Sequence, residues 1–195
     1  GLIEPIDQVT TQWFKNPGDR IILLGETKED LGGTEYLKIV HYREQGSPPL
    51  LNFEVEKALQ GCLLKMIQRG WIQSAHDCSD GGLAVTLAEC CFSPLFGEGS
   101  LSGADVQLVD GGRIRTDALL FGETPSRVVI SVSPNAAPNV LSFAEECGVL
   151  AADIGQVGGQ NLSIRVDRTS KIEVDLPISK LFERWNISIK QYVID

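Results

Sequence analysis

The chain has 195 residues, of which 43% are apolar and 22% are charged, the balance of an ordinary folded domain rather than of a disordered chain. No stretch reaches the roughly 18 consecutive apolar residues of a membrane-spanning helix, so we expect no membrane partner. The formal net charge of -9 argues against a nucleic-acid partner, because a phosphate backbone attracts a basic face. Small anions stay open as ligands, because backbone amides bind them without a basic surface. The length favours one domain over residues 1–195.

The cysteines form neither a CxxC pair nor a zinc-finger pattern: Cys62, Cys78, Cys90, Cys91 and Cys147. Such an odd set favours reduced thiols in a cytoplasmic protein. We interpret Cys62, Cys90 and Cys147 as core residues on helix faces. Cys78 lies close to His76 and is a weaker candidate for an activated thiol, since no third group is visible that would orient the pair.

Residues 1–19 are interrupted by prolines and form an N-terminal segment whose connector-like opening predicts a fragment of a larger protein. The apolar run at residues 20–25 predicts a buried strand. Residues 26–37 follow as a polar loop. Gly32 and Gly33 would let its backbone approach a ligand, and Thr34 adds a hydroxyl; a plain surface turn is the alternative.

A long amphipathic helix is predicted after Asn52, a plausible N-cap. Val55, Leu59 and Met66 recur on one face, which predicts about four helical turns that end before Gly70. Residues 71–75 then read as a strand that leads into a polar turn.

That turn, residues 76–82, has the pattern of a strand, a tight bend and the start of a helix, and we call it the acidic turn. It contains His76, Asp77, Asp80, Gly81 and Gly82. The first amides of a helix have no partner within it and can hold an anion, and two aspartates can hold a metal beside it. Two alternatives stay open: Asp80 as the N-cap of the helix, and His76 as a hydrogen-bonded structural residue.

The second half of the chain mixes strands and helices. After a helix that stops at Ser93 and Pro94 comes a loop at residues 93–103, followed by further predicted strands and helices. These are strands at 106–109 and 127–132, a helix closed by Gly148, and a hairpin of strands 152–158 and 162–166 around the turn 158–161. We expect Glu89 to be solvated or paired, and Arg127 to form an internal ion pair with Glu123.

The tail, residues 177–195, has Leu181, Phe182 and Trp185 at helical spacing and is expected to pack back on the body. Hairpin-like and helix-separated strands occur together, so the predicted fold class is α+β, a mixed β-sheet covered by helices. A doubly wound parallel sheet is less consistent with this order.

Three motifs resemble the phosphoribosylformylglycinamidine synthase family. They are the run His-Asp-Cys-Ser-Asp-Gly-Gly-Leu-Ala-Val at 76–85, Leu-Gly-Glu at 24–26 with Leu-Gly-Gly-Thr-Glu-Tyr at 31–36, and Phe-Gly-Glu at 121–123 with Ser-Arg-Val-Val at 126–129. The resemblance is to the last domain of that enzyme, the C-terminal domain of its second aminoimidazole-ribonucleotide-synthetase-like half. It covers nearly the whole chain, in the same order.

The resemblance implies a carbon–nitrogen ligase of purine biosynthesis that uses ATP, Mg²⁺ and glutamine-derived ammonia to convert formylglycinamide ribonucleotide to its amidine. It implies three partners: the preceding domains of the same enzyme, a glutaminase component or domain, and a small nucleotide substrate. The catalytic histidine of the family and most of its ligands lie on motifs that this chain lacks, so the chain alone is expected to be inactive.

From the loop and turn patterns described above, one group of residues is assigned to nucleotide or phosphate binding: Gly32, Gly33, Thr34, Gly81 and Gly82. Asp77 is the first candidate for a metal ligand, because the pseudo-symmetric turn of the family's other half has an aspartate associated with magnesium. Asp80 is the second candidate, and His76 is a further site candidate.

Two other functions stay open. The chain is either a non-catalytic module that supports a domain interface, or the C-terminal domain of another ATP-dependent member of the superfamily, such as selenophosphate synthetase or a hydrogenase-maturation protein. Whether the fragment forms a homodimer is also left open.

Overall fold

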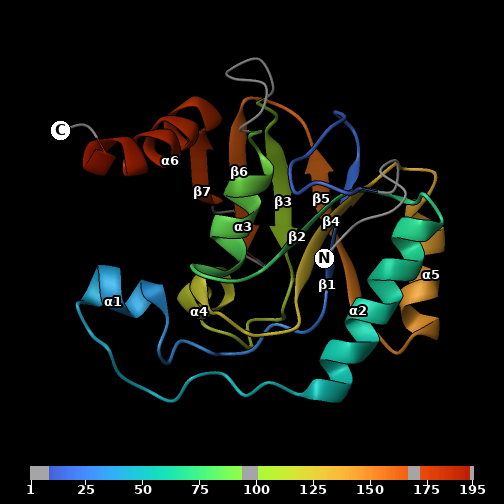
Figure 1. Cartoon of the computed structure of the whole chain (residues 1–195), viewed down its shortest axis with the longest axis horizontal. Helices are drawn as coiled ribbons and strands as arrows, with labels where there is room; N and C mark the ends of the chain where they lie inside the picture. Colours follow the sequence, from blue (N-terminus) through green and yellow to red (C-terminus); the bar gives the residue numbers. More distant parts are fainter. Residues whose placement is uncertain (1–8, 94–100, 167–171, 194–195) are drawn as a thin grey trace.

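The computed structural model describes residues 9–93, 101–166 and 172–193 (Figure 1). The strands are β1 (Arg20–Leu24), β2 (Ile72–Asp77), β3 (Ala104–Leu108), β4 (Val128–Val132), β5 (Ala151–Val157), β6 (Asn161–Val166) and β7 (Ile172–Pro177). The helices are α1 (Glu35–His41), α2 (Phe53–Gln68), α3 (Gly82–Cys90), α4 (Thr116–Phe121), α5 (Ala137–Glu146) and α6 (Ile178–Val193). None of the helices in these ranges is long and apolar enough to cross a membrane.

The described strands form one seven-stranded sheet in the order β2-β4-β1-β5-β3-β6-β7. The β3–β6 pair is parallel and the other pairs are antiparallel. The predicted α+β class with a mixed sheet is therefore confirmed.

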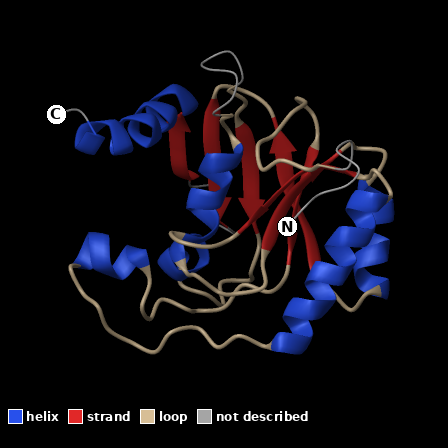
Figure 2. Ribbon diagram, viewed as in Figure 1, coloured by secondary structure: helices blue, strands red, loops and turns tan. Residues whose placement is uncertain are grey.

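Helices cover both faces of this sheet (Figure 2). Ile21 and Leu23 of β1 pack in a core with α3, α4 and the start of α6, whereas Ile22 and Leu24 pack in a second core with α2 and α5. Successive side chains of a strand point to opposite faces, so a strand buried on both faces reads as a continuous apolar run. This explains why β1 could be predicted from its composition.

The predicted hairpin at residues 152–166 is wrong, because β3 lies between β5 and β6. The chain does turn at residues 158–161, but the turn closes on Gly103 at the start of β3. The Gly103 amide donates to the Gly159 carbonyl at 3.0 Å, and the Gly158 amide donates to the Gly103 carbonyl at 2.7 Å. A Cβ at Gly103 would lie 2.5 Å from the carbonyl oxygens of Gly158 and Asn161, so the arrangement requires glycine there.

The long predicted helix is confirmed as α2. The Asn52 side chain accepts hydrogen bonds from the amides of Glu54 at 3.0 Å and Val55 at 3.3 Å. Helix α1 was missed, since residues up to 37 were predicted as loop. It has seven residues, none of them buried, which is too short for a sustained helical periodicity to show in the sequence.

The expected packing of the C-terminal tail is confirmed by α6. The rings of Phe182 and Trp185 lie 5.7 and 5.2 Å from the ring of Phe92, measured between centroids. Residues 1–5, which suggested a fragment, lie outside the described residues, as do Pro94 and most of the loop predicted at 93–103.

Candidate functional site

One short segment contacts both of the glycine-containing stretches that are predicted to form the site. Residues 121–127, which we call the clamp segment, run from the end of α4 to the start of β4. The Glu123 Oε1 atom accepts hydrogen bonds from the amides of Gly81 and Glu35, each at 2.9 Å. The acidic turn and residues 32–35, which we call the Gly-Gly-Thr loop, therefore contact the same carboxylate.

The polar groups of the Gly-Gly-Thr loop are hydrogen-bonded to neighbouring parts of the fold. Thr34 is only 2% exposed and is the N-cap of α1. Its Oγ1 atom accepts from the Leu37 amide at 3.3 Å and donates to the Leu31 carbonyl at 2.7 Å. The Gly33 amide donates to the Gln45 carbonyl at 3.0 Å. A Cβ at Gly32 would lie 2.2 Å from the Ser47 carbonyl oxygen, so this glycine permits close packing of two backbones.

The acidic turn begins α3 with Gly81, which has a φ of 80° and occupies the N-cap position. Asp80 is therefore not the N-cap, and α3 has no side-chain cap from its own N-cap residue. The Gly82 amide donates to the Ser79 carbonyl at 3.0 Å. The amides of Gly81 and Gly82 thus both have partners within the fold.

Asp77 ends β2 with its side chain 71% exposed. The Ser79 hydroxyl donates to its Oδ2 atom, and this bond is the largest cause that lowers the pKa of the Asp77 carboxyl. Partial burial opposes the shift, and a backbone hydrogen bond and neighbouring His76 add to it. Asp80 is also exposed. Both carboxylates are accessible, and Asp77 is held in its ionised form.

These two residues fit one mode of magnesium binding. Within the described residues no group of three or more His, Cys, Asp or Glu side chains is arranged to hold a metal. Mg²⁺ is often bound by one or two carboxylates together with substrate phosphates and water. Asp77 and Asp80 therefore fit a shared site better than a complete protein site.

His76 is paired on both sides of its ring. Its Nε2 atom lies 2.9 Å from Glu89 Oε2, and its Nδ1 atom lies 3.5 Å from Asp77 Oδ1. Burial by itself lowers the pKa of His76, but the two carboxylates outweigh it and raise the pKa above its ordinary value. The expectation that Glu89 is paired is confirmed, and His76 has the hydrogen bond of a structural histidine.

Arg127 does not form the predicted ion pair with Glu123. Its guanidinium, 1% exposed, donates to the carbonyls of Gly122 at 2.6 Å and Thr124 at 2.9 Å, and to the Thr27 hydroxyl at 3.2 Å. Burial lowers its pKa. Arg127 fixes the backbone of the clamp segment, which no local pattern indicated.

The weak alternative of an activated Cys78 thiol is not supported. Cys78 is 7% exposed and packs in the core, and burial raises the pKa of its thiol. A reactive cysteine needs the opposite shift. Cys62 and Cys90 are buried as expected, while Cys147 is only half-buried.

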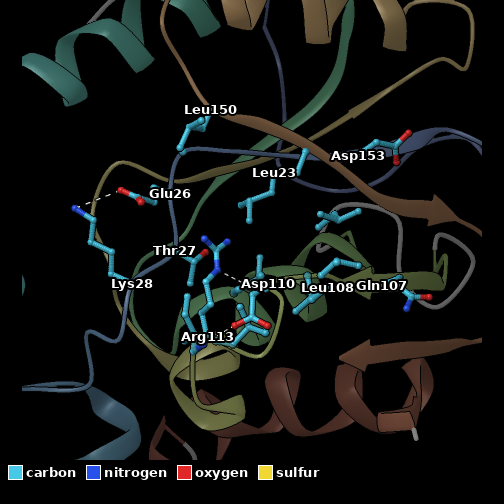
Figure 3. Close-up of a pocket in the computed structure, with 17 residues that line it drawn as sticks. Leu23, Glu26, Thr27, Lys28, Gln107, Leu108, Asp110, Arg113, Leu150 and Asp153 are labelled. Atoms are coloured by element: carbon cyan, nitrogen blue, oxygen red, sulfur yellow. Dashed lines mark hydrogen bonds and ion pairs between the residues drawn. The ribbon is translucent and has the colours of Figure 1, made fainter. Parts of the chain in front are cut away.

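A cavity of about 570 Å³ lies beside the loop that follows β1 (Figure 3). It is lined by residues from the ends of β1 and β3, the start of β5 and the loops that follow β1 and β3, among them Thr27, Asp110 and Arg113. The Arg113 Nε atom donates to the Asp110 carbonyl at 2.7 Å, and Figure 3 shows the guanidinium near Thr27. The sequence assigned residues 32–34, 76, 77 and 80–82 to the site. Among the described residues that line this cavity, none belongs to that set.

Comparisons with known proteins agree on one family. Residues 16–167 match the family described as AIR synthase related protein, C-terminal domain. The phosphoribosylformylglycinamidine synthase subunit PurL of Anaeromyxobacter sp. is 38% identical over 191 residues, which cover 95% of this chain and 24% of the relative. The PurL of Caldanaerobacter subterraneus is 41% identical over 190 residues, covering 97% and 25%. The chain thus spans about a quarter of the length of these relatives.

Solved structures show the same fold. Thermotoga maritima PurL complexed with FGAR matches with a TM-score of 0.74 and 20% identity, over 90% of this chain and 30% of that one. The complex of the same protein with ATP matches at 0.69 and 18%, over 90% and 27%. A HypE–HypF complex matches less well, at 0.56 and 21%, over 86% and 56%. These likenesses concern the fold alone.

Proposed function

Because the chain belongs to the family of AIR synthase related protein C-terminal domains, we propose that it is the C-terminal domain of a phosphoribosylformylglycinamidine synthase. That enzyme would convert formylglycinamide ribonucleotide to formylglycinamidine ribonucleotide with ATP and glutamine-derived ammonia, in the cytoplasm. Support comes from relatives named as this synthase at 38% and 41% identity over nearly the whole chain.

The observation that carries a functional role for this domain is the position of Glu123. Its carboxylate brings the Gly-Gly-Thr loop and the acidic turn together, with the exposed carboxylate of Asp77 beside them. Such a surface suits one wall of a site that the preceding domains complete. On this proposal residues 32–34, Gly81 and Gly82 line the side that faces the nucleotide.

Asp77, with Asp80 as second ligand, would hold Mg²⁺ at this wall. Magnesium, when bound, neutralises charge on the phosphates of ATP. The contribution of the chain itself is an ionised carboxylate, since the Ser79 hydroxyl lowers the pKa of Asp77. His76 would orient that carboxylate through its Nδ1 atom.

The isolated chain is proposed to be inactive, because it spans a quarter of its relatives and would lack the domains that bind most of the substrate. A glutaminase component or domain would supply ammonia. Growth of a purine auxotroph that lacks the synthase tests whether the chain needs the other domains: we expect rescue by the full-length enzyme containing this chain and no rescue by the chain alone.

The role of Asp77 is tested in the same strain with the full-length enzyme carrying Asp77→Ala, which should abolish growth without purines. Asp105→Ala is the matched control. Asp105 is also exposed, but it pairs with Arg165 across β3 and β6, which β4, β1 and β5 separate from β2 in the sheet, so this variant should grow. Normal growth with Asp77→Ala would remove Asp77 from the site.

A structural module is the second candidate, and one observation favours it. The amides of Gly33, Gly81 and Gly82 are already bonded within the fold, and Glu123 occupies a place where an anion could bind. Calorimetric titration of the chain with ATP and Mg²⁺ separates the two candidates. Binding that is lost in Asp77→Ala supports the enzyme domain, and growth of the full-length Asp77→Ala enzyme supports the structural module.

A further inference from the structure

Resting on the proposed function, we propose that Glu123 is a positioning residue that sets the spacing between the Gly-Gly-Thr loop and the acidic turn. One oxygen atom, Oε1, accepts from the amides of Glu35 and Gly81 at 2.9 Å each. These amides belong to the starts of α1 and α3, which are separated by more than forty residues in sequence. Glu123 is thus a direct bridge between the two stretches.

The bridge is needed because α3 begins without a cap of its own. Its N-cap, Gly81, has no side chain, and the first turn contains no acidic residue. The early amides of a helix are stabilised by a negative charge, and bonds from amides to a carboxylate are stronger than those between neutral groups. Glu123 therefore provides, from a segment distant in the sequence, the negative charge that the first turn of α3 lacks.

Glu123 is itself held in place by the clamp segment. Its amide donates to the Asp30 carbonyl at 3.1 Å, and Arg127 donates to the carbonyl of the preceding Gly122 at 2.6 Å. The ring of Phe121 stacks on Tyr36 of α1, with centroids 5.0 Å apart and planes 1° apart. A backbone anchored from several sides presents the carboxylate in one place, which is the requirement for positioning.

Tight packing transmits this position to the acidic turn. A Cβ at Gly82 would lie 2.5 Å from the Gly122 carbonyl oxygen, so the start of α3 lies directly against the clamp segment. Loss of the carboxylate should therefore shift both stretches together. Glu123 acts through them and does not need to touch the substrate.

Amide hydrogen exchange of the chain tests the bridge directly. In Glu123→Ala, the exchange of the Gly81 and Glu35 amides should accelerate together, by about tenfold, the equivalent of one typical hydrogen bond. Glu123→Gln keeps an acceptor oxygen and should restore most of the protection. Unchanged exchange, or acceleration at one amide alone, would overturn the proposal.

Glu29→Ala is the matched control. The Glu29 Oε1 atom also accepts from a distant backbone amide, that of Arg115 at 3.0 Å, but it contacts neither stretch. It should accelerate exchange at Arg115 and leave Gly81 and Glu35 unchanged. A general loosening of the fold would instead affect all three amides in both variants.

Steady-state kinetics of the full-length synthase separate this proposal from the proposed function. Glu123→Ala should raise KM for the nucleotide substrates by about tenfold or more with a smaller loss of kcat, and Glu123→Gln should recover most of it, since positioning acts on binding. Normal kinetics for Glu123→Ala beside an inactive Asp77→Ala would overturn the positioning role and leave the proposed function standing. Normal kinetics for both would overturn the positioning role of Glu123 and the metal-site role of Asp77, and would support the structural module.

Discussion

The Gly-Gly-Thr loop and the acidic turn share a carboxylate partner but present different surfaces. In the first, Thr34 is 2% exposed and its hydroxyl is bonded within the fold. In the second, the side chain of Asp77 is 71% exposed. Similar glycine-rich motifs thus serve two purposes: one packs backbones closely, and the other turns the chain so that a charge faces outward.

On the proposed function, the first stretch contributes packed backbone to the site and the second contributes the exposed carboxylate that would bind the metal. Substitutions in the clamp segment should disturb both, whereas substitutions within one stretch should have effects that match its own packing. The following changes test that division, beginning with the largest expected effect.

Arg127→Leu should destabilise the chain by about 3 kcal/mol, because the buried carbonyls of Gly122 and Thr124 lose their donor. Denaturant unfolding measures the change. Arg20→Leu is the control: Arg20 pairs with Asp153 at 2.7 Å, with its side chain 34% exposed, and its loss should cost less than about 1 kcal/mol. Equal losses would contradict the central role of the clamp segment.

Gly82→Ala should cost about 3 kcal/mol. Part of this is the positive φ of 68°, about 1–2 kcal/mol, and part is the clash with the Gly122 carbonyl oxygen at 2.5 Å. Gly112→Ala is a close control, because Gly112 has the same φ of 68° and no atom within 4 Å of an added Cβ. Thermal melts of both variants isolate the packing contribution, and equal shifts would show that packing against the clamp segment contributes nothing.

Thr34→Ala should cost about 1 kcal/mol, the usual loss for an N-cap, because the amide of Leu37 and the carbonyl of Leu31 lose a partner. Thr34→Ser keeps the hydroxyl and should retain most of the stability. If Thr34→Ala unfolds at the same denaturant concentration as the native chain but weakens nucleotide binding by the full-length enzyme, the Thr34 hydroxyl has a chemical role and the comparison fails.

Glu89→Gln should lower the pKa of His76, because the carboxylate that raises it is removed. A pKa raised in the folded state stabilises most below the unfolded value of about 6.5, and the contribution disappears as pH rises through the folded pKa. The native chain should therefore exceed Glu89→Gln in stability by at most about 1 kcal/mol at pH 5, and the gap should narrow toward pH 8. NMR titration of His76 measures the shift, and a gap that widens with pH would contradict the pairing.

Local chemistry allowed much of this to be predicted. Asn52 marked the start of α2, the apolar run of β1 marked a buried strand, and the position of the acidic turn followed from its glycines and aspartates. Helix α1 was not predicted, because seven residues that follow a glycine pair are too few to show a sustained helical periodicity. Arg127 was assigned the wrong partner, since sequence proximity to Glu123 says nothing about which buried carbonyls need a donor.

By itself the sequence determined which segments are helices, strands and turns where neighbours in the chain decide the outcome, and through its motifs it also indicated the family. Only the tertiary structure decided that β3 lies between β5 and β6, and that one oxygen of Glu123 joins Glu35 to Gly81. The physical reason is that caps and periodicity depend on residues a few positions away, whereas strand order and the partners of buried polar groups depend on which distant segments exclude water together.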